Sequence, residues 1–127
     1  MVKVVRRGTI LENAIEFDFF FIINDNEFNW WWVSDKLAIH QFPSVSQDEI
    51  EKKIREIFNK LGEKIKELGG EVFNGRFYCP KNKKAVREFS NMAKKQFLQF
   101  FKELSKLEEE RNLTKWLEKK YILVSWE

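Results

Sequence analysis

The chain has 127 residues, of which 43% are hydrophobic and 34% charged, and its formal net charge at pH 7 is +3. A single Cys and a single His exclude an internal disulfide framework and a cluster of soft zinc ligands, and no apolar stretch is long enough to suggest a membrane span. We therefore expect one domain over residues 1–127, a cytoplasmic location and no membrane partner. The many Lys and Glu residues are typical of a thermophile's surface. A charge of +3 does not by itself indicate nucleic acid, so the distribution of the basic residues matters more than the total.

The first seven residues alternate valines with basic side chains and predict a short leading strand. Gly8-Thr9 is the expected turn after it. Arg6 and Arg7 at the end of this strand have two interpretations. They either border a surface for an anionic ligand or protect a solvated edge strand with their charge.

Residues 15–42 are the aromatic centre of the chain and predict three consecutive antiparallel strands. Phe17, Phe19 and Phe21 alternate with other residues and so share one face, which we expect to face the core. A tight turn at Asp25-Asn26 would place Phe21 opposite Trp30 and other large apolar residues opposite one another. A second turn at Ser34-Asp35 would continue the pattern.

The opposite face of these strands is predicted to place Phe20 beside Trp31. Two large rings on an outward face need either a covering helix or partner subunit, or a ligand such as a stacked base. A register slip by one residue would exchange the two faces.

Two helices are predicted in the second half of the chain. The first begins with a capping box of Ser46 and Glu49, continues with apolar residues every three or four positions, and ends at Gly69-Gly70. The second runs from Asn82 as N-cap to about Arg111. It is so rich in Phe that it must pack on the sheet and the first helix, or on another copy of the chain, and we expect a homo-oligomer.

Shorter elements complete the chain. Asn74-Gly75 predicts a hairpin between the two helices, a short helix is expected within residues 114–120, and residues 121–126 predict a final strand. The resulting fold class is α+β, with an antiparallel sheet of about four to six strands packed with two principal helices.

Aromatic and basic residues are interleaved around the Asn74-Gly75 hairpin. Phe77 and Tyr78 lie close in sequence to Arg76, Lys81, Lys83, Lys84 and Arg87. Single-stranded nucleic acid requires cations for its phosphates and ring faces for its unpaired bases. The alternative is that Phe73 and Phe77 belong to the core and the lysines form a solvated helix start.

Catalytic signatures are missing from the sequence. His40 is the sole histidine, and no local pattern joins it to Cys79 or to a serine. The five glycines do not form a nucleotide-binding loop. We therefore expect no enzymatic activity, no cofactor and no metal site.

The phenylalanine content, the hairpin-then-helix order and the basic residues beside aromatics resemble the ThermoDBP family across about residues 15–107. That family consists of single-stranded DNA-binding proteins of thermophiles and their RNA-binding relatives. The resemblance implies an extended cleft lined by phenylalanines and flanked by basic groups, in a protein that oligomerises through helical segments. The strand-like ending YILVSW departs from the helical tail that the family would imply.

The leading hypothesis is therefore binding of single-stranded DNA or RNA with low sequence specificity. The residues expected to stack on bases are Phe20, Trp31, Phe77 and Tyr78. The residues expected to contact phosphate are Arg6, Arg7, Arg76, Lys81, Lys83, Lys84 and Arg87. The alternative is a non-enzymatic oligomeric adaptor that uses its exposed aromatic face and Phe-rich helix as an interface.

Overall fold

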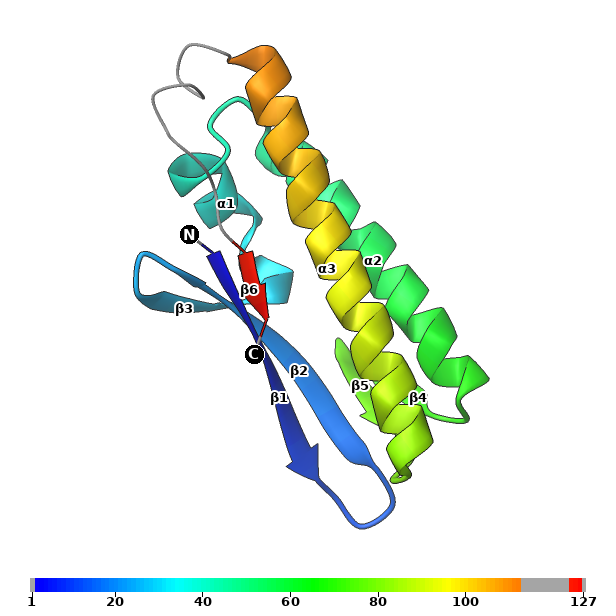
Figure 1. Ribbon diagram of the computed structural model, residues 1–127. Helices are drawn as coiled ribbons and strands as arrows, with labels where there is room; N and C mark the ends of the chain where they lie inside the picture. The colour runs from blue at the N-terminus through cyan, green and yellow to red at the C-terminus, as the bar shows by residue number, and fades with distance from the viewer. Residues whose placement is uncertain (1, 113–123, 127) are drawn as a thin grey trace.

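The computed structural model describes residues 2–112 and 124–126, and its strands form one sheet (Figure 1). The strands are β1 (Val2–Ile10), β2 (Ile15–Ile23), β3 (Asn26–Asn29), β4 (Glu71–Phe73), β5 (Arg76–Cys79) and β6 (Val124–Trp126). Their order is β4-β5-β2-β1-β6, and β3 pairs with β2 as well. All pairings are antiparallel except that of β6 with β1, which is parallel. The predicted α+β class and strand number are confirmed.

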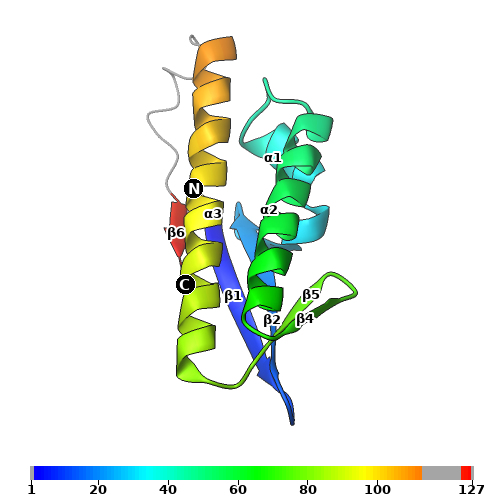
Figure 2. The ribbon, with the colours of Figure 1, turned by 90° about the vertical axis from the view of Figure 1, so that its right-hand side faces the viewer.

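The two principal helices lie side by side over one face of this sheet (Figure 2). They are α2 (Gln47–Glu67) and α3 (Lys83–Arg111), and two short elements, η1 (Trp30–Trp32) and α1 (Ser34–His40), follow β3. Within the described part of the chain, neither long helix has an apolar stretch that could cross a bilayer.

The alternation in β2 decides which face of the sheet is buried. Phe17, Phe19 and Phe21 are at most 3% exposed, as predicted for the core face. The ring centroid of Phe97 on α3 lies 5.1 Å from that of Phe19 and 5.5 Å from that of Phe21. Most apolar residues of α3 are thus covered by the sheet and α2 within one chain, although Leu98 is 41% exposed. The expected homo-oligomer stays a prediction.

The turn after β2 differs from the predicted one by one position. Asn24 and Asp25, with φ angles of 49° and 65°, occupy the turn in place of Asp25-Asn26. Both angles are left-handed, as a type I′ hairpin turn requires, and Asn and Asp tolerate them. Phe21 therefore pairs with Phe28 rather than with Trp30, a shift of two residues that preserves the two faces.

The prediction of three consecutive strands is wrong for the third strand. The chain leaves the sheet after Asn29, whose side chain caps η1 by accepting a hydrogen bond of 2.9 Å from the backbone N–H of Trp31. The buried Trp30 ring then stacks on Phe58 of α2, which favours a turn over a continued strand. Trp32 is left 76% exposed.

The first strand is longer than predicted. Gly8 and Thr9 lie inside β1, where they pair with Phe17 and Glu16. The turn comes instead between β1 and β2, where the N–H of Leu11 donates to the carbonyl of Ala14.

The predicted boundaries of the two long helices and of the second hairpin are confirmed, whereas Ser34 and Asp35, the predicted second turn, begin α1. The capping box of Ser46 and Glu49 starts α2, and Asn82 caps α3. The Asn74-Gly75 turn joins β4 to β5 with φ angles of 50° and 73°. The final strand, predicted over residues 121–126, is confirmed as β6 for residues 124–126. Residues 121–123 and the short helix expected within residues 114–120 lie outside the described residues.

Candidate nucleic-acid interface

Two open cavities follow one side of α3 and share Asn91. The first has a volume of about 450 Å³ and is lined by Arg6, Ile15, Lys81, Asn82, Lys83, Val86, Arg87, Ser90 and Asn91. The second has a volume of about 390 Å³ and is lined by Asn91, Lys94, Lys95, Leu98, Gln99 and Lys102. We call the two together the α3 groove. Among the described residues, seven Lys and Arg line it and no Asp or Glu does, so positive charge follows this side of α3.

Two of the cations in the α3 groove are held in place by contacts with other elements. Arg6 of β1 donates a hydrogen bond to the hydroxyl of Ser90 on α3, and its guanidinium carbon lies 5.4 Å from the Phe17 ring centroid. Lys81 donates from Nζ to the carbonyl of Glu12, at 3.2 Å. These contacts leave further N–H groups on both side chains, because a guanidinium has five donors and an ammonium has three.

The predicted phosphate contacts fall into two groups in space. Arg6, Lys81, Lys83 and Arg87 meet in the α3 groove, although Arg6 is far from the others in sequence. Lys84 is exposed in the first turn of α3 but does not line the groove.

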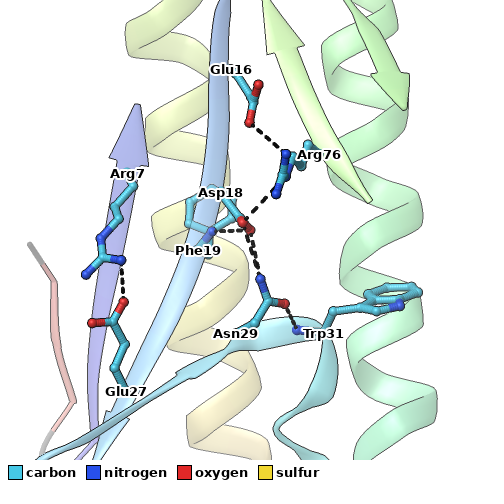
Figure 3. A network of polar contacts seen from close by, with 8 residues as sticks. All are labelled: Arg7, Glu16, Asp18, Phe19, Glu27, Asn29, Trp31 and Arg76. Carbon is cyan, nitrogen blue, oxygen red and sulfur yellow. Dashed lines mark hydrogen bonds and ion pairs between the residues drawn. The ribbon is translucent and has the colours of Figure 1, made fainter. Parts of the chain in front are cut away.

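Arg7 and Arg76 belong to the opposite face of the sheet, the side away from Phe17 and Phe19 (Figure 3). Both are paired with carboxylates, Arg7 with Glu27 and Arg76 with Glu16 at 3.4 Å. They are about half exposed, so solvent screens these ion pairs and phosphate oxygens could compete for the guanidinium groups.

The prediction that Phe77 stacks on bases is wrong. Its pairing with Phe17 places the ring on the core face, where it is fully buried and its centroid lies 5.3 Å from that of Phe89. A ring enclosed on both sides cannot receive a base, so the core alternative holds for Phe77. It is wrong for Phe73, which is 65% exposed.

The other expected stacking residues remain partly exposed but do not lie together. Phe20 pairs with Asn29 rather than with Trp31. The guanidinium carbon of Arg7 lies 4.4 Å from the ring centroid of Phe20. Tyr78 pairs with Glu16 on the same outer face. Trp31 lies apart from both, at the edge of the sheet.

The edge of β2 has a gap between two strand partners. β5 pairs with β2 as far as Phe17 and β3 begins pairing at Phe20, so Asp18 and Phe19 lack a strand partner on that side. The Asp18 carboxylate fills the gap by accepting a hydrogen bond of 2.8 Å from the backbone N–H of Phe19 (Figure 3). Burial raises the pKa of Asp18, which the hydrogen bond from Phe19 and the charge of Arg76 only partly offset.

A cavity of about 310 Å³ opens at this gap, and we call it the sheet-edge pocket. It is lined by Asp18, Asn29, Trp31, Trp32, Phe58, Asn74, Gly75 and Arg76. Trp32 is the functional candidate that the sequence analysis missed, because its exposure depends on the chain leaving the sheet at Asn29. The ring centroids of Trp31 and Phe58 are 4.7 Å apart, so they form one continuous aromatic wall.

Groups suited to metal binding or nucleophilic catalysis do not gather in the described residues. No set of three or more His, Cys, Asp or Glu side chains there could hold a metal ion. Cys79 is buried, which raises its pKa and disfavours the reactive thiolate, and His40 is exposed at the end of α1.

Comparisons with known proteins give no relative. No protein-family model, curated protein or solved structure matches this chain. The resemblance to the ThermoDBP family therefore stays a prediction.

Proposed function

We propose that this protein binds single-stranded nucleic acid, with the α3 groove as the site for the sugar-phosphate backbone. The observation that carries the proposal is the set of seven Lys and Arg residues that line the groove without any carboxylate. Because the whole chain has a net charge of only +3, this arrangement is a local concentration of positive charge. When Lys and Arg side chains neutralise phosphates, the nucleic acid releases its counterions, and this favours binding whatever the base sequence.

A route from the groove to exposed rings supports a single strand as the ligand. Arg6 and Arg7 are consecutive residues of β1 and point to opposite faces of the sheet, the first into the groove and the second over Phe20. β6 pairs only with Val2–Val4, so residues 5–10 of β1 have no further strand partner among the described residues. A strand leaving the groove across this edge would reach Phe20, and unpaired bases can stack on such a ring while paired bases cannot.

The expected stacking set changes accordingly. Phe77 is removed because it is buried, and Trp32 joins Phe20, Trp31 and Tyr78 because it is the most exposed ring at the sheet edge. Most of the affinity is assigned to phosphate contacts, which keeps the expected sequence specificity low.

Fluorescence anisotropy with labelled oligo-dT and oligo-U tests this proposal at two salt concentrations. We expect micromolar or tighter binding that weakens as salt increases, and weaker binding to a duplex of the same length. Charge reversal of Arg87→Glu together with Lys95→Glu should abolish most of this binding.

The matched control is the pair Lys52→Glu and Lys66→Glu on α2, which changes the net charge equally but leaves the groove lining intact. If both double variants lose the same affinity, total charge rather than the groove is responsible. Absence of oligonucleotide binding at low salt would remove the proposal.

A further inference from the structure

The sheet-edge pocket combines an aromatic wall with a carboxylate that the protein leaves short of close partners. Its volume of about 310 Å³ is at the lower end of the range of about 300 to 1,000 Å³ that is usual for small-molecule sites. Trp31 and Trp32 supply ring surface, and Asp18, Asn29 and Arg76 supply polar groups. Flat ligands with hydrogen-bonding edges suit such a combination.

The contacts of Asp18 show how much acceptor capacity remains. One close hydrogen bond comes from the backbone N–H of Phe19, at 2.8 Å. The Asn29 amide nitrogen is 3.2 and 3.4 Å from the two carboxylate oxygens, at or beyond the long end of the usual range. The Arg76 Nε is 3.9 Å from Oδ2, too far for a hydrogen bond.

A carboxylate offers about four acceptor positions, so Asp18 can accept further hydrogen bonds from a ligand in the pocket. Only 16% of its side-chain surface is exposed, and water therefore satisfies these positions poorly. Burial of a charged group without full pairing is costly, and a ligand that donates to it recovers part of that cost.

The Asn29 side chain is fixed and cannot simply turn to complete the pairing. Its Oδ1 accepts a hydrogen bond of 2.9 Å from the backbone N–H of Trp31, which directs the amide nitrogen toward Asp18 (Figure 3). The acceptor side of the pocket is thereby preorganised before any ligand arrives.

Among the four common bases, guanine fits this pattern of charges best. Its Watson–Crick edge presents two adjacent donors, N1–H and the N2 amino group, beside the acceptor O6. The two donors match the two oxygens of Asp18, and O6 would face the guanidinium of Arg76. Adenine, cytosine and uracil each place an acceptor where guanine has one of these donors, and that acceptor would oppose the carboxylate.

We infer that the sheet-edge pocket binds one unpaired guanine, with its ring against the exposed Trp32 and its Watson–Crick edge on Asp18 and Arg76. The inference deepens the proposed function, because the bound strand would supply the guanine. It adds a preference at one position to contacts that are otherwise independent of sequence.

Calorimetric titration with the four ribonucleoside 5′-monophosphates at neutral pH tests the pocket without a strand. All four carry the same phosphate and sugar, so differences between them report on the base alone. We expect GMP to bind about tenfold or more tightly than AMP, CMP or UMP, as a bidentate contact would provide.

Asp18→Asn should reduce the advantage of GMP to about twofold or less, because an amide offers one acceptor and one donor in place of two acceptors. The variant keeps an oxygen that can accept from the Phe19 N–H, and thermal unfolding verifies that it folds. Glu16→Gln is the matched control, since Glu16 also pairs with Arg76 but does not line the pocket, and it should keep the preference.

Trp32→Ala provides a second variant on an exposed side chain that the fold does not need. It should weaken all four nucleotides by a similar factor of about fivefold or more and leave their ratio unchanged, since every base has a ring face. Equal affinities of the four nucleotides for the unaltered protein, or a preference for GMP that survives Asp18→Asn, would overturn the inference.

The same protein titrated with oligo-dT separates this result from the proposed function. Oligo-dT binding without a GMP preference rejects the guanine site and leaves the groove proposal standing. A GMP preference without oligo-dT binding keeps the guanine site and rejects the groove as a strand-binding surface.

Discussion

Arg111, in the last turn of α3, donates two hydrogen bonds of 2.8 and 2.7 Å to the carboxylate of Glu49, in the first turn of α2. Glu49 also accepts from the backbone N–H of Ser46 at 2.9 Å as part of the capping box. The same guanidinium donates to the carbonyl of Ser44 at 3.2 Å. These hydrogen bonds of Arg111 therefore connect the end of α3 to the start of α2 and to the loop before α2.

Low pH should weaken the interaction between Arg111 and Glu49. The hydrogen bonds from Arg111 and from Ser46 lower the pKa of Glu49 from 4.5 to about 2. A carboxyl whose pKa is lower in the folded state stabilises the fold above its unfolded pKa and loses that contribution as the pH falls toward the folded value. Urea unfolding should thus show a difference between Glu49→Gln and the unaltered protein that is largest above pH 4.5 and shrinks toward pH 2. A difference that stays constant down to pH 2 would contradict the assigned cause.

Asp18 should show the opposite dependence. Burial raises its folded pKa above 3.8, so ionisation of Asp18 disfavours the folded state. The unaltered protein should lose stability relative to Asp18→Asn as the pH rises from 3.8 through the raised folded pKa, with a constant difference above that value. Urea midpoints across this range measure the effect, and a gain in relative stability with rising pH would contradict the assigned cause.

Gly70 is required by the close approach of β5. A Cβ added there would lie 2.1 Å from the carbonyl oxygen of Tyr78, which is backbone and cannot turn aside. Gly70→Ala should therefore destabilise the protein by about 1 to 3 kcal/mol or more. At Gly62, inside α2, an added Cβ would meet only Val72 at 3.6 Å, and Gly62→Ala should stabilise the protein by about 0.5 to 1 kcal/mol. Thermal unfolding of the two variants should show shifts of opposite sign.

Phe77 should matter for folding rather than for stacking. It is fully buried against Phe19, Phe58 and Phe89, so Phe77→Ala should cost about 3 to 5 kcal/mol. Tyr78→Ala, on the outer face next to it, should cost clearly less in denaturant unfolding. Under conditions where it stays folded, a Phe77→Leu variant should bind oligo-dT as well as the unaltered protein does.

The salt dependence of oligonucleotide binding should report how many groove cations contact phosphate. For single strands, the slope of log K against log salt changes by about 0.7 for each contact. Lys94→Ala should reduce the slope by about that amount, whereas Lys66→Ala on α2 should leave it unchanged. An unchanged slope in Lys94→Ala would place the phosphates elsewhere.

Elements whose signals are local were correctly predicted from the sequence. Ser46 and Glu49 form the capping box within four residues, and the Asn74-Gly75 turn needs only its own backbone angles. The alternation in β2 identified its buried face because side chains in a strand point alternately to the two sides. Such features depend on residues that are close together in the sequence, so they can be predicted from the sequence alone.

The run after Asn29 could not be predicted in the same way. Trp30, Trp31 and Trp32 suit a strand by their aromatic character, but the buried position available to Trp30 and the Asn29 cap favour a turn of helix. The sequence alone likewise left Phe77 open as either core or binding residue, because only its pairing with Phe17 fixes the direction of its ring.

Hydrophobic periodicity, capping and turn residues act over a few positions, so the sequence alone predicts the two long helices, the Asn74-Gly75 turn and the aromatic core face. Only the tertiary structure brought Arg6 to Lys83 and Arg87, and only the gap between β3 and β5 brought Asp18 to Trp31. Both candidate sites join residues from separate elements, and their formation depends on strand order and on where the chain leaves the sheet. Those choices are made by packing of the whole domain, which no short stretch of sequence encodes.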